Sequence, residues 1–184
     1  NSNKGIDVVS VRRLLFLLIV LLAPAVLRAQ SDEPVADEIT VSLEFKGVGS
    51  TEIPAMYNDK DVFLAVSSVF DFLRIKNVPA QSFDTISGFF LTEQDRFLLD
   101  RIHNRIYYQG KVIESKDGFL KSETSLYMNL KYFKSVFGLD GAFYFRRLVV
   151  TMSSESELPI IREMRQDLMR KNVNRLTGDV KADT

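Results

Sequence analysis

The sequence of 184 residues contains no cysteine and no tryptophan, and His103 is its only histidine. The absence of cysteine excludes disulfides, thiolate metal sites and cysteine nucleophiles together. A zinc site needs three or four protein ligands, mostly cysteine and histidine, so one histidine argues against such a site. His103 lies between Arg101 and Arg105 in a predicted strand, with no sequence pattern of a carboxylate and a nucleophile around it. We interpret it as a surface or strand residue.

The sequence also has no glycine-rich phosphate loop and no nucleophile elbow. The acidic pairs Asp59/Asp61 and Glu155/Glu157 lack the alternating ligands and distal glutamate of a calcium loop, so we assign them to turns and surface. Glu93 and Asp95 form a third pair, but a glycosidase needs two carboxylates facing each other across a cleft. We therefore predict no catalytic, cofactor-binding or metal-binding residue, no cofactor, and a protein that is not an enzyme.

No excess of charge of either sign is present, since 24 basic residues balance 24 acidic ones. Removing residues 1–30 takes away four basic residues and one acidic residue, which leaves a formal balance of −3. Nucleic-acid-binding domains carry a basic surface, so this balance argues against a nucleic-acid partner.

The one long apolar run is Leu14–Leu27, which follows Arg12 and Arg13 and is interrupted by Pro24. A membrane-spanning helix needs roughly 20 apolar residues, so this run is short for one. We predict that residues 1–30 are a secretory signal peptide with Ala29 at the cleavage site; cleavage after Ala25 and an uncleaved anchor are the alternatives. Export without cysteine favours the periplasm or outer membrane of a Gram-negative bacterium.

A stretch of the chain occurs twice. Asp61–Ile75 aligns without a gap on Ser125–Leu139 at a constant offset of 64 residues, and apolar residues match apolar residues. Each copy begins with three adjacent apolar residues, typical of a short buried strand, and continues with apolar positions three or four apart. A helix of about ten residues does not persist alone in water, so each copy must pack its helix on a sheet.

Other segments predict the elements around this repeat. Ile39–Phe45 alternates strictly and pairs with Ile53–Tyr57 as a hairpin, and a helix follows at 67–73 with Ser67 or Ser68 as its N-cap. Pro79 ends the segment that contains this helix. The remaining expected elements are strands at Phe83–Leu91, Arg96–Tyr108 and Lys111–Glu114, a helix at 130–137 ended by Gly138, and a strand at 142–152. In two of these strands the alternation of apolar and polar residues shifts by one position, at Asp100–Arg101 and at Arg146–Arg147. We expect a bulge or bend at both places.

The predicted fold class is α+β. An antiparallel-rich sheet is built from a duplicated strand, short helix and strand unit, both copies share the sheet, and the helices pack on one face. The predicted organisation is a signal peptide (1–30), a flexible leader (31–38), the duplicated module (39–154), and a C-terminal amphipathic helix with a linker (155–184).

Pro159 suits the first turn of the C-terminal helix, and Ile161, Met164, Leu168 and Val173 recur at helical spacing. The helix either packs back on the sheet through this stripe or leads into a further domain, and we expect a downstream domain after Thr184. A membrane-surface helix is a third reading, which Glu163 and Asp167 disfavour.

Aromatic residues are frequent in the strands, and they have two interpretations. Packing in the core and on the sheet is the first, and a platform that binds a sugar or a peptide is the second. Adjacent aromatics in a strand point to opposite faces, so one of Tyr107 and Tyr108 is expected to be exposed or covered by a partner, and Tyr144 likewise. The set is Phe89, Phe90, Tyr107, Tyr108, Tyr127, Tyr132, Phe143, Tyr144 and Phe145.

The repeated segments FLAVSSVFDFL and LYMNLKYFKSVFGL resemble the modules of copper amine oxidase N-terminal-like, or stalk, domains. Ala65 and Asn129 stand where those modules usually carry proline. The chain from Ile39 to Arg175 is also similar to the N-terminal periplasmic region of usher-like outer-membrane proteins. There a signal peptide, a strand-rich module and a segment like Leu158–Arg170 precede a large β-barrel. This resemblance implies a barrel beyond Thr184, a role in handling or docking envelope proteins, and no catalytic residue.

Two functional hypotheses follow. The first is a non-enzymatic exported module that recognises an envelope or secreted protein, by strand addition at an open sheet edge, and reaches the membrane through the downstream barrel. The second is a stand-alone secreted domain that binds glycan or cell wall through exposed aromatic side chains.

Overall fold

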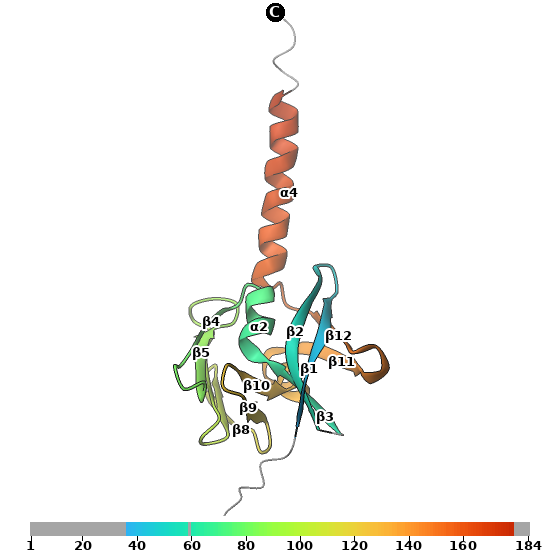
Figure 1. Ribbon diagram of the computed structural model, residues 1–184. Coiled ribbons are helices and arrows are strands. Elements are labelled where there is room, and N and C mark those ends of the chain that lie inside the picture. Colours follow the sequence, from blue (N-terminus) through green and yellow to red (C-terminus); the bar gives the residue numbers. More distant parts are fainter. Residues whose placement is uncertain (1–35, 59, 179–184) are drawn as a thin grey trace, which may run out of the picture. The chain divides into compact units, whose positions relative to one another are not determined.

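The computed structural model describes residues 36–58 and 60–178, in which strands form a seven-stranded and a five-stranded sheet (Figure 1). The predicted signal peptide and most of the predicted leader lie outside these residues. The mixed α and β composition confirms the predicted fold class, with two sheets in place of one. Over the described ranges, no helix is both long and apolar enough to cross a membrane.

The larger sheet has the strand order β11-β12-β1-β2-β3-β10-β9, and all its neighbours are antiparallel except β1 and β12. As predicted, β1 alternates, with Val41, Leu43 and Phe45 buried. It begins two residues before the predicted strand, so Asp37 and Glu38 pair with β2 and do not belong to a flexible leader. The strands are β1 (Asp37–Phe45), β2 (Gly49–Asn58), β3 (Asp61–Ala65), β9 (Phe119–Lys121), β10 (Leu126–Asn129), β11 (Leu139–Tyr144) and β12 (Val149–Ser154).

The smaller sheet is antiparallel throughout, in the order β4-β5-β6-β7-β8. Its first strand includes Pro79, the residue expected to end the preceding segment, and a proline is tolerated there because β4 is an edge strand. The strands are β4 (Lys76–Pro79), β5 (Thr85–Phe89), β6 (Arg96–Asp100), β7 (Arg105–Tyr108) and β8 (Lys111–Glu114).

The repeat is present as β3 followed by α2 (Val66–Phe72) and β10 followed by α3 (Leu130–Phe137). The two repeated strands are neighbours in the larger sheet, with Leu64 opposite Met128, so the prediction of a shared sheet is confirmed for them. The copies diverge after their helices. The chain after α2 enters the smaller sheet as β4, whereas the chain after α3 returns to the larger sheet as β11.

The two helices begin differently. The predicted serine N-cap of α2 is wrong, because Ala65 occupies the cap position and no side chain caps the helix. Asn129 caps α3, and its side-chain oxygen accepts a hydrogen bond from the Lys131 backbone N–H at 3.1 Å. Gly138 ends α3 in the left-handed conformation at φ 67°, as predicted.

Both predicted bulges are turns. Arg101–Asn104 separates β6 from β7, and Asn104 closes that turn at φ 51°. The short 3-10 helix η2 (Phe145–Arg147) separates β11 from β12, and Leu148 follows it at φ 50°. At both positions, the shift in the alternation of apolar residues therefore marks a turn at which the chain reverses direction.

Phe137 lies where the two sheets and the two helices share one core. Its ring lies 5.1–5.5 Å from the rings of Phe70, Phe90, Phe97 and Tyr108, which belong to α2, the smaller sheet and the segment after β5. Phe72, which the repeat predicted to be a core residue, is only partly buried at the margin of this cluster. Phe137 of α3 therefore lies at the centre of the core and contacts residues from α2 and from the smaller sheet.

The C-terminal helix α4 (Pro159–Gly178) begins at the predicted proline and contacts the rest of the chain through its first residues. The Ile160 N–H donates to the Leu73 carbonyl at 3.3 Å, Ile161 packs against the core, and Glu163 lies 3.5 Å from Arg74. Of the alternatives considered for this helix, packing on the sheet extends only to Ile161, because the Met164 and Leu168 side chains are 39% and 61% exposed.

Candidate functional site

The nine aromatic residues of the predicted platform do not form one surface. Phe90 and Tyr127 are buried, and five others are partly buried in different strands and helices. Only Tyr144 and Phe145, with 50% and 57% of their surface exposed, are freely accessible, so packing explains most of the set. Tyr107 and Tyr108 are the adjacent pair in β7. Tyr108 packs on Phe90 and Phe137, while Tyr107 is half-buried on the other side of the strand.

An aromatic cluster forms around the exposed pair. Phe143, at the end of β11, and Phe145, in η2, both contact Tyr57 of β2, with ring centroids 5.8 and 4.9 Å from the tyrosine ring. The two phenylalanine rings lie 6.2 Å apart. We call these three residues the aromatic triad. The parallel pairing of β12 with β1 begins only at Ser42 and Val149, so the triad lies at the end of the sheet where β1 enters.

The four edge strands of the two sheets differ in how they are protected. Edge strands expose unpaired backbone groups, and proteins usually shorten them or place lysine, other charges or proline in them. β4 reads KNVP, β8 reads KVIE, and β9 has only three residues and ends in a lysine. β11 reads LDGAFY, is six residues long and carries one charge, Asp140. It is the longest and least protected edge in the described part of the chain.

A shallow depression of about 480 Å³ adjoins this edge. Its lining comes from the ends of β1, β12 and β11, and is mostly polar or small apart from Phe45 and Met152. Gly141 and Ala142 of β11, which have no large side chain, form part of its lining. The depression and the triad therefore lie along the same edge strand.

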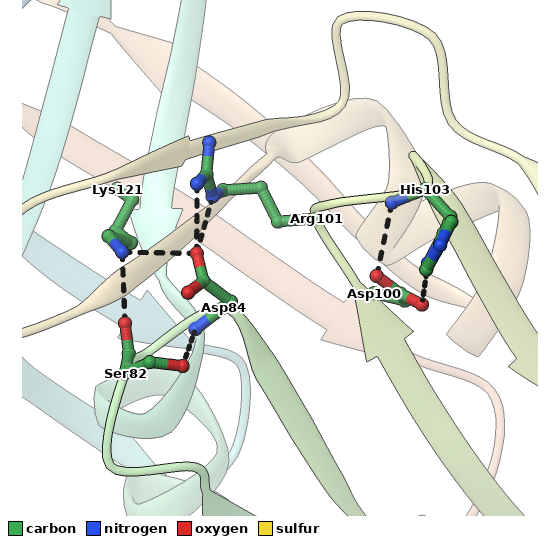
Figure 2. A network of polar contacts seen from close by, with 6 residues as sticks. All are labelled: Ser82, Asp84, Asp100, Arg101, His103 and Lys121. Carbon is green, nitrogen blue, oxygen red and sulfur yellow. Dashed lines mark hydrogen bonds and ion pairs between the residues drawn. The ribbon is translucent and has the colours of Figure 1, made fainter.

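A separate polar network joins the two sheets (Figure 2). Asp84 Oδ1 accepts hydrogen bonds from Arg101 Nη2 at 2.8 Å and from Lys121 Nζ at 3.0 Å. Arg101 follows β6 in the smaller sheet, and Lys121 ends β9 in the larger one. The Lys121 amine also donates to the Ser82 carbonyl at 3.0 Å. This arrangement fixes the β9 edge of one sheet against the other, which is a structural role.

Hydrogen bonds from Arg101, then from Lys121 and Ser82, lower the pKa of Asp84 from 3.8 to about 2. A carboxyl whose pKa is lower in the folded state stabilises the fold above its unfolded pKa, and this stabilisation is lost as the pH falls through the folded pKa. The contribution of Asp84 should therefore disappear between about pH 3.8 and about pH 2.

We expect the wild-type protein to lose more stability across this interval than the Asp84→Asn variant, since the amide keeps the shape but not the charge. Urea unfolding at several pH values across the interval measures the difference. Asp140→Asn is the control, because the Asp140 carboxyl pairs with Lys134 at 3.0 Å but is largely exposed. Parallel pH profiles for the wild type and Asp84→Asn would contradict the assignment.

His103, expected to be a surface residue, lies in the β6–β7 turn with a largely exposed ring. Its Nδ1 lies 2.7 Å from Asp100 Oδ2, and its backbone N–H donates to Asp100 Oδ1 (Figure 2). Burial opposes the charged form of Asp100, but the hydrogen bonds from His103 outweigh it and lower the pKa of the carboxyl. A carboxylate can orient an imidazole as a general base, but a nucleophile must then lie in reach. No described hydroxyl hydrogen-bonds the ring.

The acidic pairs have the turn and surface roles expected of them where the structure describes them. The Asp61 backbone N–H donates a hydrogen bond to Asn58 Oδ1, Asp95 accepts hydrogen bonds from Thr92 and Gln109, and Glu157 pairs with Arg165. Asp59 lies outside the described residues. Among residues 36–58 and 60–178, no three His, Cys, Asp or Glu side chains are grouped so that they could hold a metal ion.

One partly buried polar contact was not foreseen from the sequence. Tyr127 of β10 donates its hydroxyl hydrogen to Glu38 Oε1 at 2.6 Å, across 89 positions of the chain. Burial, and then this hydrogen bond, raise the pKa of Tyr127 to about 12, so the hydroxyl remains a donor. Tyr127 packs with Phe63 and Ala65 in a small second apolar cluster, so the contact helps to fix the start of β1.

Comparisons with protein-family models, with curated proteins and with solved structures found no match to this chain.

Proposed function

We propose that this chain is a non-enzymatic exported module of the cell envelope that recognises an envelope or secreted protein by strand addition along β11. The observation that supports this most directly is the contrast among the four edges, in which β11 is the longest, has neither lysine nor proline, and carries a single charge, Asp140. We further propose, from the sequence resemblance, that it is the periplasmic N-terminal part of an usher-like outer-membrane protein.

Strand addition needs an accessible backbone and a nearby contact for side chains. Main-chain hydrogen bonds to an edge strand supply affinity, and pockets for alternate side chains supply specificity. β11 has the small residues Gly141 and Ala142 at its centre, so no large side chain of the strand itself projects there. The aromatic triad follows at its end and offers an apolar contact.

To test strand addition, peptides that bind the chain are selected from a random display library. Peptides of about 12 residues are long enough to cover a strand and its flanks. Hydrogen exchange of the wild-type complex should show increased protection of the β11 amides. Ala142→Lys places a charge on the exposed centre of the edge, and we expect it to weaken binding about tenfold or more. Val112→Lys in β8 is the matched control, because Val112 is also an exposed residue of an edge strand.

Selected peptides that leave the β11 amides unprotected, or that bind Ala142→Lys as tightly as the wild type, would count against strand addition at this edge. A glycan-binding domain is the second candidate, favoured by the exposed Tyr144. Retention of the wild type on insoluble peptidoglycan would support it if Tyr144→Ala abolished that retention and the half-buried Tyr107→Ala did not.

A further inference from the structure

Three features meet at the end of β11. The aromatic triad presents Phe145, more than half exposed, against Tyr57 and Phe143. Tyr144 and Leu148 are exposed on either side of the same short turn. Three of the exposed large apolar side chains of the described chain therefore lie within five consecutive residues.

The same turn carries two adjacent cations. Arg146 and Arg147 are exposed, and neither has an ion pair with another described residue. The acidic residue of the edge, Asp140, is different, because Lys134 neutralises it at 3.0 Å near the other end of β11. The turn at the Tyr144 end of the edge therefore carries two cations that no described carboxylate pairs with.

The position of the arginines is fixed by the backbone. The turn closes at Leu148 with φ 50°, a left-handed conformation that is unfavourable for leucine, and the Leu148 carbonyl accepts a hydrogen bond from Ser42 N–H at 2.8 Å. Strained backbone of this kind persists where the surrounding structure holds it, and it is frequent at binding sites. The hydrogen bond holds the end of the turn beside β1, next to the triad.

We infer that the segment added to β11 is an acidic, aromatic-containing peptide strand. Its apolar side chain would pack on Tyr57, Phe143 and Phe145, and its neighbouring carboxylates would pair with Arg146 and Arg147. This inference rests on the proposed strand addition, and it specifies the chemistry of the partner. An anionic lipid surface is a different occupant, and we favour the peptide because two cations beside an open backbone edge are few for stable membrane attachment.

Three synthetic peptides test the charge and apolar requirements. All have one alternating Thr/Val body; the first ends in Phe-Glu-Glu, the second in Phe-Lys-Lys and the third in Ala-Glu-Glu. Titration of the full chain, followed by backbone NMR shifts, gives each dissociation constant and its binding surface. We expect the first peptide to bind along β11 about fivefold or more tightly than either of the others, since exposed ion pairs each contribute modestly. The preference over the lysine peptide should shrink in high salt.

The double variant Arg146→Glu/Arg147→Glu should reverse the preference between the glutamate and lysine peptides. Its matched control is Arg105→Glu/Lys111→Glu, which reverses two exposed charges in the smaller sheet and should change nothing. Both variants alter exposed side chains, and thermal unfolding checks that each is folded.

Equal binding of the three peptides along β11 would overturn the inference and leave strand addition standing. Absence of binding by all three would overturn it too, while the library selection decides separately whether β11 binds any strand. Binding of phosphatidylglycerol vesicles, lost in the Arg146→Glu/Arg147→Glu variant, without binding of the acidic peptide would overturn it in favour of a lipid surface.

Discussion

Replacing Phe137 with alanine is expected to destabilise the protein by about 3–5 kcal/mol, the usual range for a phenylalanine removed from a close-packed core. Phe137 is 3% exposed and contacts four aromatic rings. Those rings come from α2, from the smaller sheet and from the segment after β5, so a cavity at this position weakens the contact between the two sheets.

Urea unfolding of Phe137→Ala measures this loss, with Phe145→Ala as the control for removing an exposed phenylalanine. The repeat led us to expect that Phe72→Asp and Phe137→Asp would both unfold the module. Phe72 is only partly buried, so we now expect Phe137→Asp to be much the more damaging of the two, because a buried unpaired charge is far more costly than an accessible one. Similar midpoints for Phe137→Ala and Phe145→Ala would show that the core is not centred on Phe137.

Gly88→Ala is the second substitution with a large expected effect, a loss of about 3 kcal/mol or more from overpacking. Gly88 is the fourth of the five residues of β5 and lies between Asn77 of β4 and Phe97 of β6. A Cβ atom there would lie 2.0 Å from the Lys76 carbonyl oxygen and 2.8 Å from the Phe97 ring. A backbone oxygen in a sheet cannot move away without breaking strand pairing, so the smaller sheet would be disrupted.

Gly141→Ala is the matched control, because its new Cβ would meet mainly the end of the Leu130 side chain, at 2.9 Å. A side-chain terminus can rotate away, so this variant should lose much less stability than Gly88→Ala. Thermal and urea unfolding of both variants, with circular dichroism to check strand content, give the comparison. A Gly88→Ala variant as stable as Gly141→Ala would contradict the close approach of β4 to β5.

The local elements were largely predictable. Alternation in Ile39–Phe45 identified β1, and apolar spacing with Gly138 placed α3 at its observed bounds. The predicted helix at 67–73 was one residue late, because we expected a serine cap and the buried Ala65 took that position. Changes of phase at Asp100–Arg101 and Arg146–Arg147 were visible, but alternation alone does not distinguish a bulge from a short turn between antiparallel strands.

The sequence identified some residues of the candidate site but not their arrangement in space. Tyr144 was singled out as an aromatic at risk of exposure, and the possibility of an open edge was foreseen. Nothing in the sequence shows that β11 is an edge, because that depends on which strands pair. Tyr57 was not assigned to the aromatic set, since its contact with Phe143 and Phe145 joins segments far apart in the chain.

By itself, the sequence determined the α+β class, the duplicated strand and helix, and the absence of cysteine chemistry, because these depend on composition and on periodicity within a few residues. The tertiary structure alone decided that the chain after α2 enters a second sheet while the chain after α3 returns to the first. It also decided that β11 is an edge strand and that Tyr57 contacts Phe143 and Phe145 across the sheet. Strand partners are chosen by long-range packing and backbone hydrogen bonding, and two similar local sequences can therefore lead to different sheets.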